Sequence, residues 1–274
     1  MPALLARSGA RNCATLRKMR LIRLKRGVAM PALEAVVFDM DGTILHSLPD
    51  LAACANEAFS RMGFPTHSES EFRKHMGGGG VRLIDHVVPA EATAEQRRRA
   101  FELWRSLYIA SDYALTEPFP GVVDVLVALR AQGMKTAVLS NKFDEGVHML
   151  AERHFPGLFD AVRGDKPPAP TKPDPTTLLQ MLDDLGVRPE TAAYVGDTNI
   201  DAQTARNAGV MAIGVSWGYD KANPLRADEL DAYLHEPADL LDVPRVRAHG
   251  GLSRGGDVSG GSAAGGLSRG SDAS

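Results

Sequence analysis

Four short apolar runs, separated by helical patterns, constrain the fold of this chain more than any other feature of its sequence. Each run ends next to polar residues, and the runs cover residues 33–38, 136–139, 192–195 and 210–215. Runs of this length, rich in β-branched residues, predict buried strands. Between them, apolar residues recur at helical spacing over 122–129, 177–185 and 202–208, and a glycine follows each pattern. Strands that alternate with helices predict an α/β fold with a doubly wound parallel sheet.

The interval between the first two predicted strands is too long for a simple crossover connection. Residues 47–116 contain helical patterns, including those at 48–59 and 97–109, and no convincing strand. A crossover between parallel strands needs only about a dozen residues or somewhat more. We therefore predict an inserted α-helical cap at residues 47–116, and a core built from residues 31–46 and 117–246.

The two ends of the chain differ in composition from its middle. Residues 1–29 carry eight Lys or Arg and no Asp or Glu, although the net charge of the whole chain is −3. This basic extension, residues 1–30, has three open interpretations: a transit peptide, an arm that contacts nucleic acid or membrane, or sequence upstream of a start at Met30. Residues 247–274 are rich in Gly and Ser, which predicts a disordered tail.

Composition excludes several classes of protein. Hydrophobic residues make up 44 % and charged residues 24 % of the 274 residues, as in globular domains. Two cysteines cannot build the disulfide framework of a small secreted scaffold, so we expect a cytoplasmic protein, with organellar targeting by residues 1–29 left open. No apolar run approaches the roughly 18–20 residues of a membrane span. The acidic net charge argues against nucleic acid as a partner.

Carboxylates, a hydroxyl and a lysine are predicted to meet at one edge of the sheet. Asp39 follows the first run, Ser140 follows the second and Asp197 follows the third. Ligands of open parallel sheets bind outside the carboxyl ends of the strands, where these side chains converge. Lys172 lies in the loop before the helical pattern at 177–185. Clustered carboxylates favour Mg²⁺, which also binds substrate phosphate oxygens, and the lysine suits the remaining phosphate oxygens.

The segment Asp39-x-Asp41-Gly42-Thr43 is the most specific signal in the chain. Two acids separated by one residue point the same way on an extended segment. One carboxylate can attack phosphorus, while the second protonates the leaving oxygen and later activates water. Gly42 allows the sharp turn that this arrangement needs. The alternative interpretation is a capped turn without chemistry, because Asp, Gly and Thr are common turn residues.

Four segments, in this order, resemble the motifs of the haloacid dehalogenase (HAD) superfamily. They are Val-Val-Phe-Asp-Met-Asp-Gly-Thr-Ile-Leu at 36–45, Leu-Ser-Asn-Lys at 139–142, Lys-Pro-Asp-Pro at 172–175 and Val-Gly-Asp-Thr-Asn-Ile-Asp at 195–201. The resemblance extends over about residues 35–241 and is greatest to the phosphoglycolate phosphatases. It implies a Rossmann-like hydrolase core with an inserted helical cap.

The resemblance also implies a role for each residue of these motifs. Asp39 would be the nucleophile that forms an aspartyl-phosphate, and Asp41 would be the general acid/base. The catalytic residues would be Asp39, Asp41, Ser140 and Lys172. Mg²⁺ would lie on Asp39, Asp197 and the backbone carbonyl of Asp41, with Asp201 supporting it from the next helical turn. The substrate or its phosphate would contact Thr43, Ser140, Asn141, Lys142, Gly79 and Arg82.

Two of these residues belong to the predicted cap. The resemblance suggests that the glycine-rich segment 77–80 faces the active site and that Arg82 meets a substrate carboxylate. A plain surface turn with a surface arginine is the alternative. The sequence departs from the family at His46, a hinge position between core and cap where many relatives have Asp.

The predicted function is Mg²⁺-dependent hydrolysis of a small phosphomonoester, in the first place 2-phosphoglycolate, through an aspartyl-phosphate. Asp41 argues against a dehalogenase, which lacks an acid at that position. The same residue fits a broad sugar-phosphate phosphatase or a β-phosphoglucomutase-like mutase, and a non-enzymatic protein that binds a phosphorylated ligand is a further alternative. We expect a small phosphorylated substrate as the partner and no association with a membrane. Monomer and homodimer are both left open.

Overall fold

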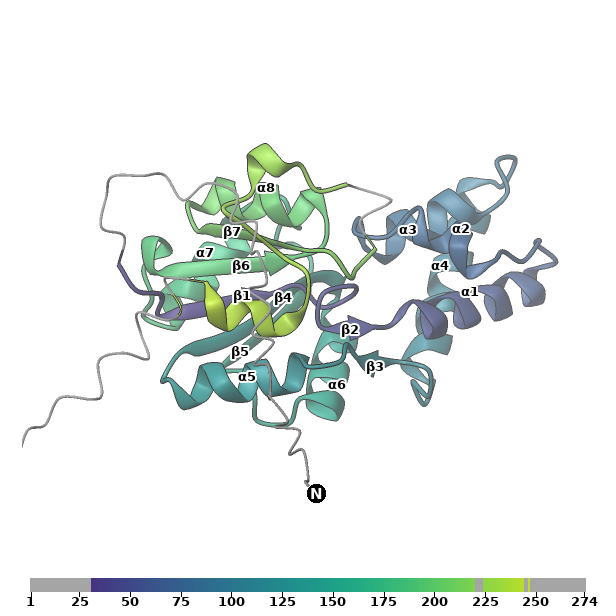
Figure 1. Ribbon diagram of the computed structural model, residues 1–274. Coiled ribbons are helices and arrows are strands. Elements are labelled where there is room, and N and C mark those ends of the chain that lie inside the picture. The colour runs from purple at the N-terminus through teal and green to yellow at the C-terminus, as the bar shows by residue number, and fades with distance from the viewer. Residues whose placement is uncertain (1–30, 220–223, 244–245, 247–274) are drawn as a thin grey trace, which may run out of the picture.

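The computed structural model describes residues 31–219, 224–243 and 246, and a six-stranded sheet forms its centre (Figure 1). The strand order is β5-β4-β1-β6-β7-β8, and every neighbouring pair is parallel. The strands are β1 (Ala35–Phe38), β4 (Lys135–Phe143), β5 (Ala161–Asp165), β6 (Ala192–Gly196), β7 (Met211–Val215) and β8 (Ala232–Leu234). This sheet confirms the predicted α/β class. The predicted basic extension and tail, residues 1–30 and 247–274, lie outside the described residues.

Helices cover both faces of the sheet. They are α5 (Val122–Ala131) and α6 (Asp144–His154) on one face, and α7 (Thr176–Asp184) and α8 (Asn199–Ala208) on the other. Strand β1 serves both faces, because Val36 and Phe38 pack with the first pair of helices while Ala35 and Val37 pack with the second. Burial on both sides explains why the central strands read as continuous apolar runs.

A block of four helices is inserted between two short strands. Strand β2 (Leu45–His46) pairs antiparallel with β3 (Glu117–Pro118). The block, called the helical insertion below, contains α1 (Leu48–Met62), α2 (Glu69–Arg73), α3 (Gly79–Val87) and α4 (Ala94–Ile109). Figure 1 shows it to one side of the sheet. Residues 47–116, all of them described, contain no strand, as the sequence predicts.

Four strands of the structure have no counterpart in the sequence prediction. Strand β5 lies at the sheet edge, is half-buried, and reads Ala-Val-Arg-Gly-Asp, so it has no apolar run to mark it. Strands β2, β3 and β8 are only two or three residues long, too short for any periodicity. Helix α4 begins earlier than its apolar pattern, at Ala94, because Thr93 caps it through the backbone N–H of Gln96.

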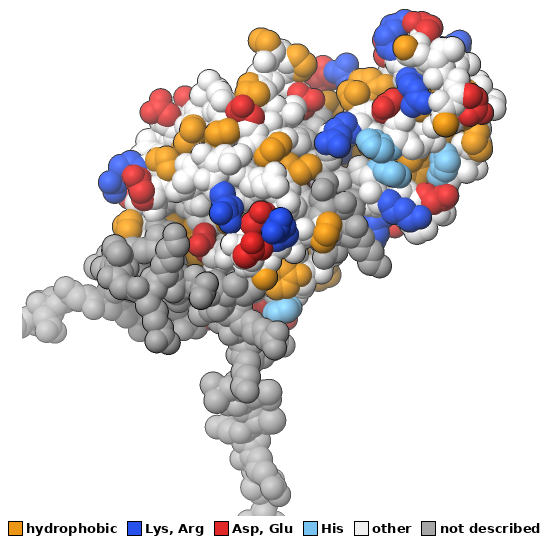
Figure 2. All heavy atoms as spheres, turned by 90° about the horizontal axis from the view of Figure 1, so that it is seen from above, with side chains coloured by type: hydrophobic (Ala, Val, Ile, Leu, Met, Phe, Trp, Pro, Cys, Tyr) orange, Lys and Arg blue, Asp and Glu red, His pale blue; other side chains and the backbone are white. Residues whose placement is uncertain are grey.

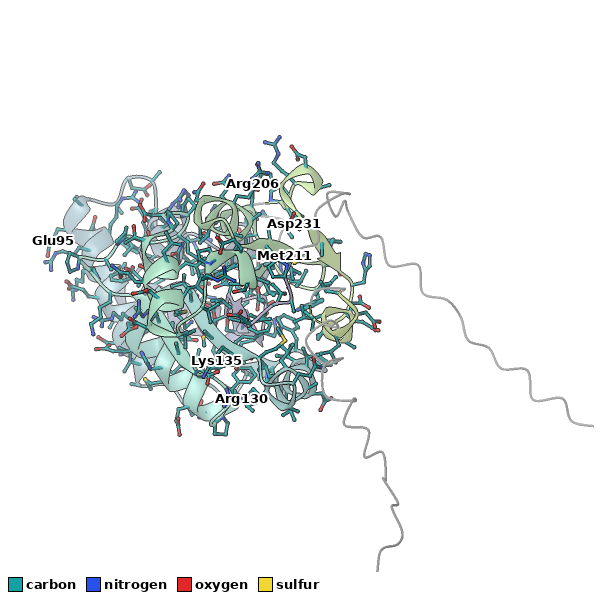
Figure 3. All side chains as sticks on the ribbon, turned by 90° about the vertical axis from the view of Figure 1, so that its left-hand side faces the viewer. Glu95, Arg130, Lys135, Arg206, Met211 and Asp231 are labelled. Carbon is teal, nitrogen blue, oxygen red and sulfur yellow. The ribbon has the colours of Figure 1, made fainter. Side chains whose placement is uncertain are left out.

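The two edge strands start with the same acid contact to their neighbouring strand. Asp160 precedes β5, and its carboxylate accepts a hydrogen bond from the Thr136 backbone N–H at 2.9 Å. Asp231 precedes β8 and accepts from the Ala212 backbone N–H at the same distance, 2.9 Å. Arg130 pairs with Asp160 at 2.9 Å, and Figure 3 shows Arg130 close to the start of β4. These contacts lie at the amino ends of the strands and pin the edges of the sheet.

The surface has mixed charge. On the face shown in Figure 2, Lys and Arg side chains alternate with Asp and Glu, and single hydrophobic side chains are scattered among them. None of the helices in the described part of the chain is both long and apolar enough to cross a membrane.

Candidate active site

Three carboxylates lie close together at the carboxyl ends of the central strands. Asp39 follows β1, Asp197 follows β6, and Asp201 lies in the first turn of α8. One oxygen of each lies within 4.8 Å of the others, and all three side chains are buried. The structure therefore brings together the acids from the first and fourth sequence motifs.

The loops that carry these acids hold them by hydrogen bonds. Asp201 accepts from the Thr198 backbone N–H at 3.0 Å in a capping box that starts α8. Asp197 accepts from the Thr43 hydroxyl at 3.1 Å and from the Tyr219 backbone N–H at 2.6 Å. Gly42 has φ 92° and lies so close to Asp197 that a Cβ would come within 2.4 Å of Oδ2. Only glycine fits there, both for conformation and for space.

Lys172 is the cation beside this cluster. Its Nζ lies 2.9 Å from Asp39 Oδ1 and 2.7 Å from Asp201 Oδ1, and it donates to the Tyr194 hydroxyl at 2.9 Å. Burial lowers the pKa of Lys172, but the two carboxylates outweigh it and hold the pKa well above its usual value. Lys172 therefore carries its charge at neutral pH.

One lysine does not balance three buried carboxylates. Burial raises the pKa of Asp39 to about 6, against the lowering by Lys172, and burial with Asp201 and Asp39 nearby raises the pKa of Asp197 well above its usual value. Asp39 Oδ1 is also buried and accepts no well-aligned hydrogen bond from the described residues, although Lys172 is near. Two uncompensated negative charges on hard oxygen atoms fit a divalent cation such as Mg²⁺.

The Asp41 carboxylate is not one of the three clustered acids and has partners of its own. Lys142 Nζ lies 3.2 Å from its Oδ2, and the Ser47 hydroxyl donates to its Oδ1 at 2.5 Å. Lys142 also lies over the Tyr108 ring of α4, 4.3 Å from the ring centre. A metal contact through the Asp41 backbone carbonyl stays a prediction, as does a phosphate contact by Lys142.

A cavity of about 460 Å³, open mouth included, lies between the carboxylates and the helical insertion. From the core it is lined by Asp39, Asp41, Ser140, Asn141, Lys142, Phe143 and Lys172. From the insertion it is lined by Leu51, His75, Met76, Gly77, Gly79, Gly80, Leu83 and Trp104. Charged groups thus meet an apolar wall, which suits a ligand with a charged head and a small remainder.

Asn141 joins the insertion to the core at this cavity. Its side chain donates to the Gly77 backbone carbonyl at 3.3 Å, and its Oδ1 accepts from the Lys172 backbone N–H at 2.9 Å. Gly79, with φ 83°, packs on the Asn141 backbone so closely that a Cβ would lie 2.8 Å from its carbonyl oxygen. The glycine-rich segment therefore faces the site, as the sequence analysis expects.

Two predicted substrate contacts do not lie at the cavity. Thr43 is fully buried against Asp197. Arg82 is exposed on α3 and is not among the residues that line the cavity. The ionisable cap side chain that does line it is His75, whose ring stacks on His86 with centroids 5.0 Å apart.

Comparison with known proteins places this geometry in a family. Residues 36–215 match the family of haloacid dehalogenase-like hydrolases. The chain belongs to this family. A phosphoglycolate phosphatase of Vibrio vulnificus (strain YJ016) is 32 % identical over 224 residues, 79 % of this chain and 98 % of the relative. One of Pseudomonas putida is 36 % identical over 216 residues, 75 % of this chain and 78 % of the relative.

The structural comparison agrees. A crystal structure from Lactobacillus delbrueckii subsp. bulgaricus, assigned as a phosphoglycolate phosphatase, has a TM-score of 0.69 and 31 % identity. The match covers 76 % of this chain and 97 % of that chain. This haloacid dehalogenase-like hydrolase is thus an enzyme related to the phosphoglycolate phosphatases, as its four motifs predict.

Sequence reasoning assigned no role to three residues of the haloacid dehalogenase-like site. Tyr194 lies inside the apolar run of β6, and its hydroxyl contacts Lys172 and donates to the Leu139 carbonyl at 2.6 Å. Ser47 and Tyr219 lie in two loops that resemble the phosphoglycolate phosphatases but are less specific than the four motifs. A tyrosine in a strand that is otherwise fully apolar was the available signal, because a buried hydroxyl needs a polar partner.

Proposed function

We propose that this protein hydrolyses a small phosphomonoester, in the first place 2-phosphoglycolate, with the help of a divalent cation. One observation carries the proposal: Asp39 lines the cavity, and it does so beside Lys172 and two further buried carboxylates. A carboxylate held this way can reach a phosphoryl group whose charge is already offset. The names of the relatives at 32 % and 36 % identity support the choice of substrate.

In the proposed reaction, an Asp39 oxygen attacks phosphorus and the bond between phosphorus and the ester oxygen breaks. Asp41 gives its proton to that oxygen, so the alcohol leaves and an aspartyl-phosphate remains on Asp39. Asp41 then takes a proton from water, whose oxygen attacks phosphorus. The Asp39 carboxylate is restored as phosphate leaves, and one water is consumed.

The other residues of the site stabilise charge. Lys172 Nζ, 2.9 Å from Asp39 Oδ1, would lie against the transferring phosphoryl oxygens. Ser140 and the Asn141 backbone, both at the cavity, would hold the same group. A divalent cation bound by Asp39, Asp197 and Asp201 would supply positive charge against the carboxylates and the phosphoryl oxygens. The insertion would exclude bulk water and contact the remainder of the substrate.

The direct test is phosphate release from a panel of esters, each assayed with Mg²⁺ and with excess chelator. The panel holds 2-phosphoglycolate, glucose 1-phosphate, glucose 6-phosphate and a nucleotide, with pyrophosphate as an outgroup. We expect metal-dependent release with a strong preference for 2-phosphoglycolate. Preference for another ester would rule out 2-phosphoglycolate as the main substrate but would leave the proposed hydrolysis in place.

Two further outcomes would contradict the proposed hydrolysis itself. Conversion of glucose 1-phosphate to glucose 6-phosphate without phosphate release would identify a mutase, which Asp41 also fits. No turnover of any ester by protein shown to be folded would identify a binding protein.

A further inference from the structure

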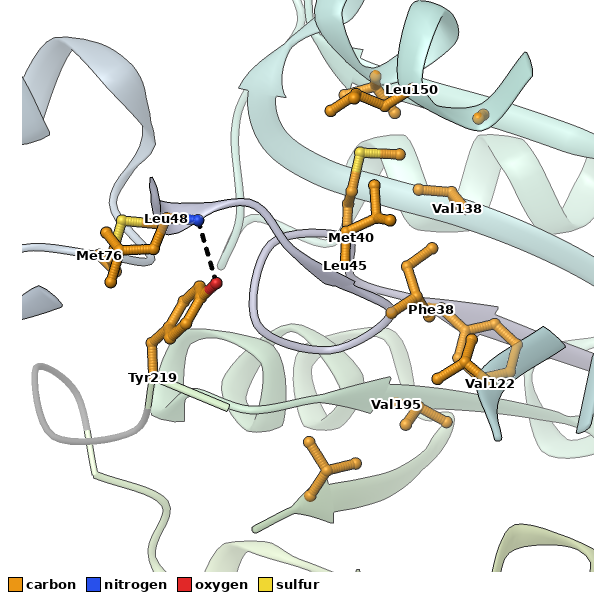
Figure 4. Packing of buried hydrophobic residues seen from close by; sticks show 14 of the residues in the cluster. Phe38, Met40, Leu45, Leu48, Met76, Val122, Val138, Leu150, Val195 and Tyr219 are labelled. Carbon is orange, nitrogen blue, oxygen red and sulfur yellow. Dashed lines mark hydrogen bonds between the residues drawn. The ribbon is translucent and has the colours of Figure 1, made fainter. Parts of the chain in front are cut away.

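The groups that ordinarily cap the start of a helix form hydrogen bonds with the core at the first turn of α1. Ser47 is the N-cap residue, yet its side chain caps no backbone N–H and donates to Asp41 Oδ1 at 2.5 Å. The first helical N–H, that of Leu48, donates to the Tyr219 hydroxyl at 3.2 Å (Figure 4). N-cap side chains ordinarily satisfy N–H groups of their own helix. Here the start of the insertion is tied to two loops of the core.

Tyr219 connects this turn with the carboxylate cluster. Its backbone N–H donates to Asp197 Oδ2 at 2.6 Å, and its side chain is 1 % exposed. Its hydroxyl also lies 2.8 Å from His46 Nδ1 in β2. The guanidinium of Arg73, from α2, lies 5.1 Å from the centre of its ring. One residue thus contacts the proposed cation site, the entrance strand of the insertion and two of its helices.

The ring of Tyr219 is also held tightly from the side of the core. A Cβ on Gly42 would come within 2.8 Å of its Cδ2 atom, so the ring lies directly against the loop after Asp41. Packing this close transmits small displacements instead of absorbing them. A shift of Asp197 would therefore move the Tyr219 backbone, and with it the hydroxyl that holds the start of α1.

We propose that Tyr219 is a positioning residue that couples cation binding at Asp39, Asp197 and Asp201 to closure of the helical insertion over the cavity. The inference rests on the proposed function for the presence of the cation. A cation that fixes Asp197 fixes the Tyr219 backbone, and the hydroxyl then holds α1 in the position seen here. Coupling is reciprocal, so closure strengthens cation binding by the same factor.

The test is Tyr219→Phe, which keeps the ring and the backbone N–H and removes only the hydroxyl. Mg²⁺ affinity is measured by calorimetry, and hydrogen exchange is followed in a peptide that contains Leu48, with and without Mg²⁺. In the unmodified protein we expect Mg²⁺ to slow exchange of that peptide. In the variant this protection should disappear and the Mg²⁺ Kd should rise about two- to tenfold, the range for one hydrogen bond.

Kinetics separate coupling from a purely structural role. We expect Tyr219→Phe to raise the KM for substrate and the Mg²⁺ concentration for half-maximal rate, while kcat at saturation of both changes far less. Tyr113→Phe is the matched control, because it removes the hydroxyl of another buried tyrosine, one that contacts Met149 Sδ at 3.8 Å. His46→Leu removes the second hydroxyl partner and should act in the same direction if Tyr219→Phe folds poorly.

Four results would overturn the proposal. One is unchanged Mg²⁺ affinity and unchanged Mg²⁺-dependent protection in a folded Tyr219→Phe protein. Another is faster exchange at Leu48 that is the same with and without Mg²⁺, which would mark a structural contact. If the unmodified protein binds Mg²⁺ but gains no protection, the coupling fails alone; if it binds no Mg²⁺, the proposed function fails with it.

Discussion

Lys142 and Asp41 form a partly buried ion pair in the wall of the cavity, with 3.2 Å between Nζ and Oδ2. Burial lowers the pKa of Lys142, and the Asp41 carboxylate opposes that shift. The sequence places Lys142 among the phosphate ligands, whereas the structure places its ammonium on the proposed general acid/base. The two roles predict different kinetics.

We expect Lys142→Met to lower kcat about 10²-fold with little change in KM, because it would release Asp41 from its position. Lys135→Met is the control, since Lys135 lies at the other end of the same strand, where it pairs with Asp160 at 3.6 Å. A large rise in KM with kcat retained would assign Lys142 to the phosphate instead.

Replacement of the proposed nucleophile should remove turnover. We expect Asp39→Asn to lower kcat by about 10⁴-fold or more, the scale on which loss of a nucleophile acts. Asp124→Asn makes the same chemical change on the exposed first turn of α5 and should leave the rate unchanged. Phosphate release measures both, and near-normal activity of Asp39→Asn would exclude an aspartyl-phosphate.

Burial of Asp197, with Asp201 and Asp39 close to it, makes the ionised form of this side chain unfavourable in the folded protein. The pKa of Asp197 is raised, so its ionised form weakens folding, and this penalty grows as pH rises through that pKa. We therefore expect Asp197→Asn to melt above the unmodified protein in chelator. Mg²⁺ at 100 times its Kd should stabilise the unmodified protein by about 2.7 kcal/mol, and the variant far less. Thermal unfolding with and without Mg²⁺ measures both effects. An equal rise in the melting temperature of both proteins on addition of Mg²⁺ would contradict the prediction.

Two residues of the helical insertion, His75 and Arg82, are candidates to contact the part of the substrate beyond its phosphate. His75 lines the cavity, whereas Arg82 is exposed outside it. We expect His75→Ala to raise the KM for 2-phosphoglycolate severalfold more than Arg82→Ala does. The same pair of variants assayed with the phosphate ester of an uncharged alkyl group is the control, and equal effects of the two variants on 2-phosphoglycolate would restore Arg82 to the site.

The acid contacts at the sheet edges should affect stability and not chemistry. Asp160→Ala leaves the Thr136 N–H and Arg130 without their carboxylate partner, so we expect a loss of about 1–3 kcal/mol in the free energy of unfolding. Asp231→Ala should lower the free energy of unfolding by less, because the contact to the Ala212 backbone is lost without the loss of an arginine pair like that of Asp160. Denaturant unfolding measures both, and kcat should be retained.

The fold could be predicted where apolar runs or helical periodicity carry it. The runs of β1, β4, β6 and β7 are buried on both faces, so their sequences are continuous, and the ends of β1 and β6 predict where Asp39 and Asp197 lie. Strand β4 continues past its apolar run to Phe143, so Ser140 lies inside the strand and not after it. Strand β5 has no such run, because an edge strand is only half-buried and tolerates Arg163 and Asp165. The short strands β2, β3 and β8 depend on tertiary pairing alone.

The candidate site also has a part that local sequence patterns predict and a part that depends on tertiary contacts. Strand ends fix Asp39 and Asp197, and Asp201 follows in the first turn of α8, so the convergence of the three acids is readable from the sequence. The direction of the Asp41 side chain depends on partners 6 and 101 residues away, Ser47 and Lys142, which no local pattern encodes. The position of Arg82 depends on how α3 is rotated against the cavity, and a glycine-rich start leaves that rotation open.

The chain passes from the core into the helical insertion through β2 and returns through β3, and these two strands pair with each other. Both crossings of the chain therefore share one short ribbon. A block of different sequence, grafted between His46 and Glu117, would enter and leave at the same place without altering the register of the central sheet. This geometry would make the insertion an exchangeable module, and under the proposed function substrate choice and phosphoryl chemistry would be encoded in separate stretches of the chain.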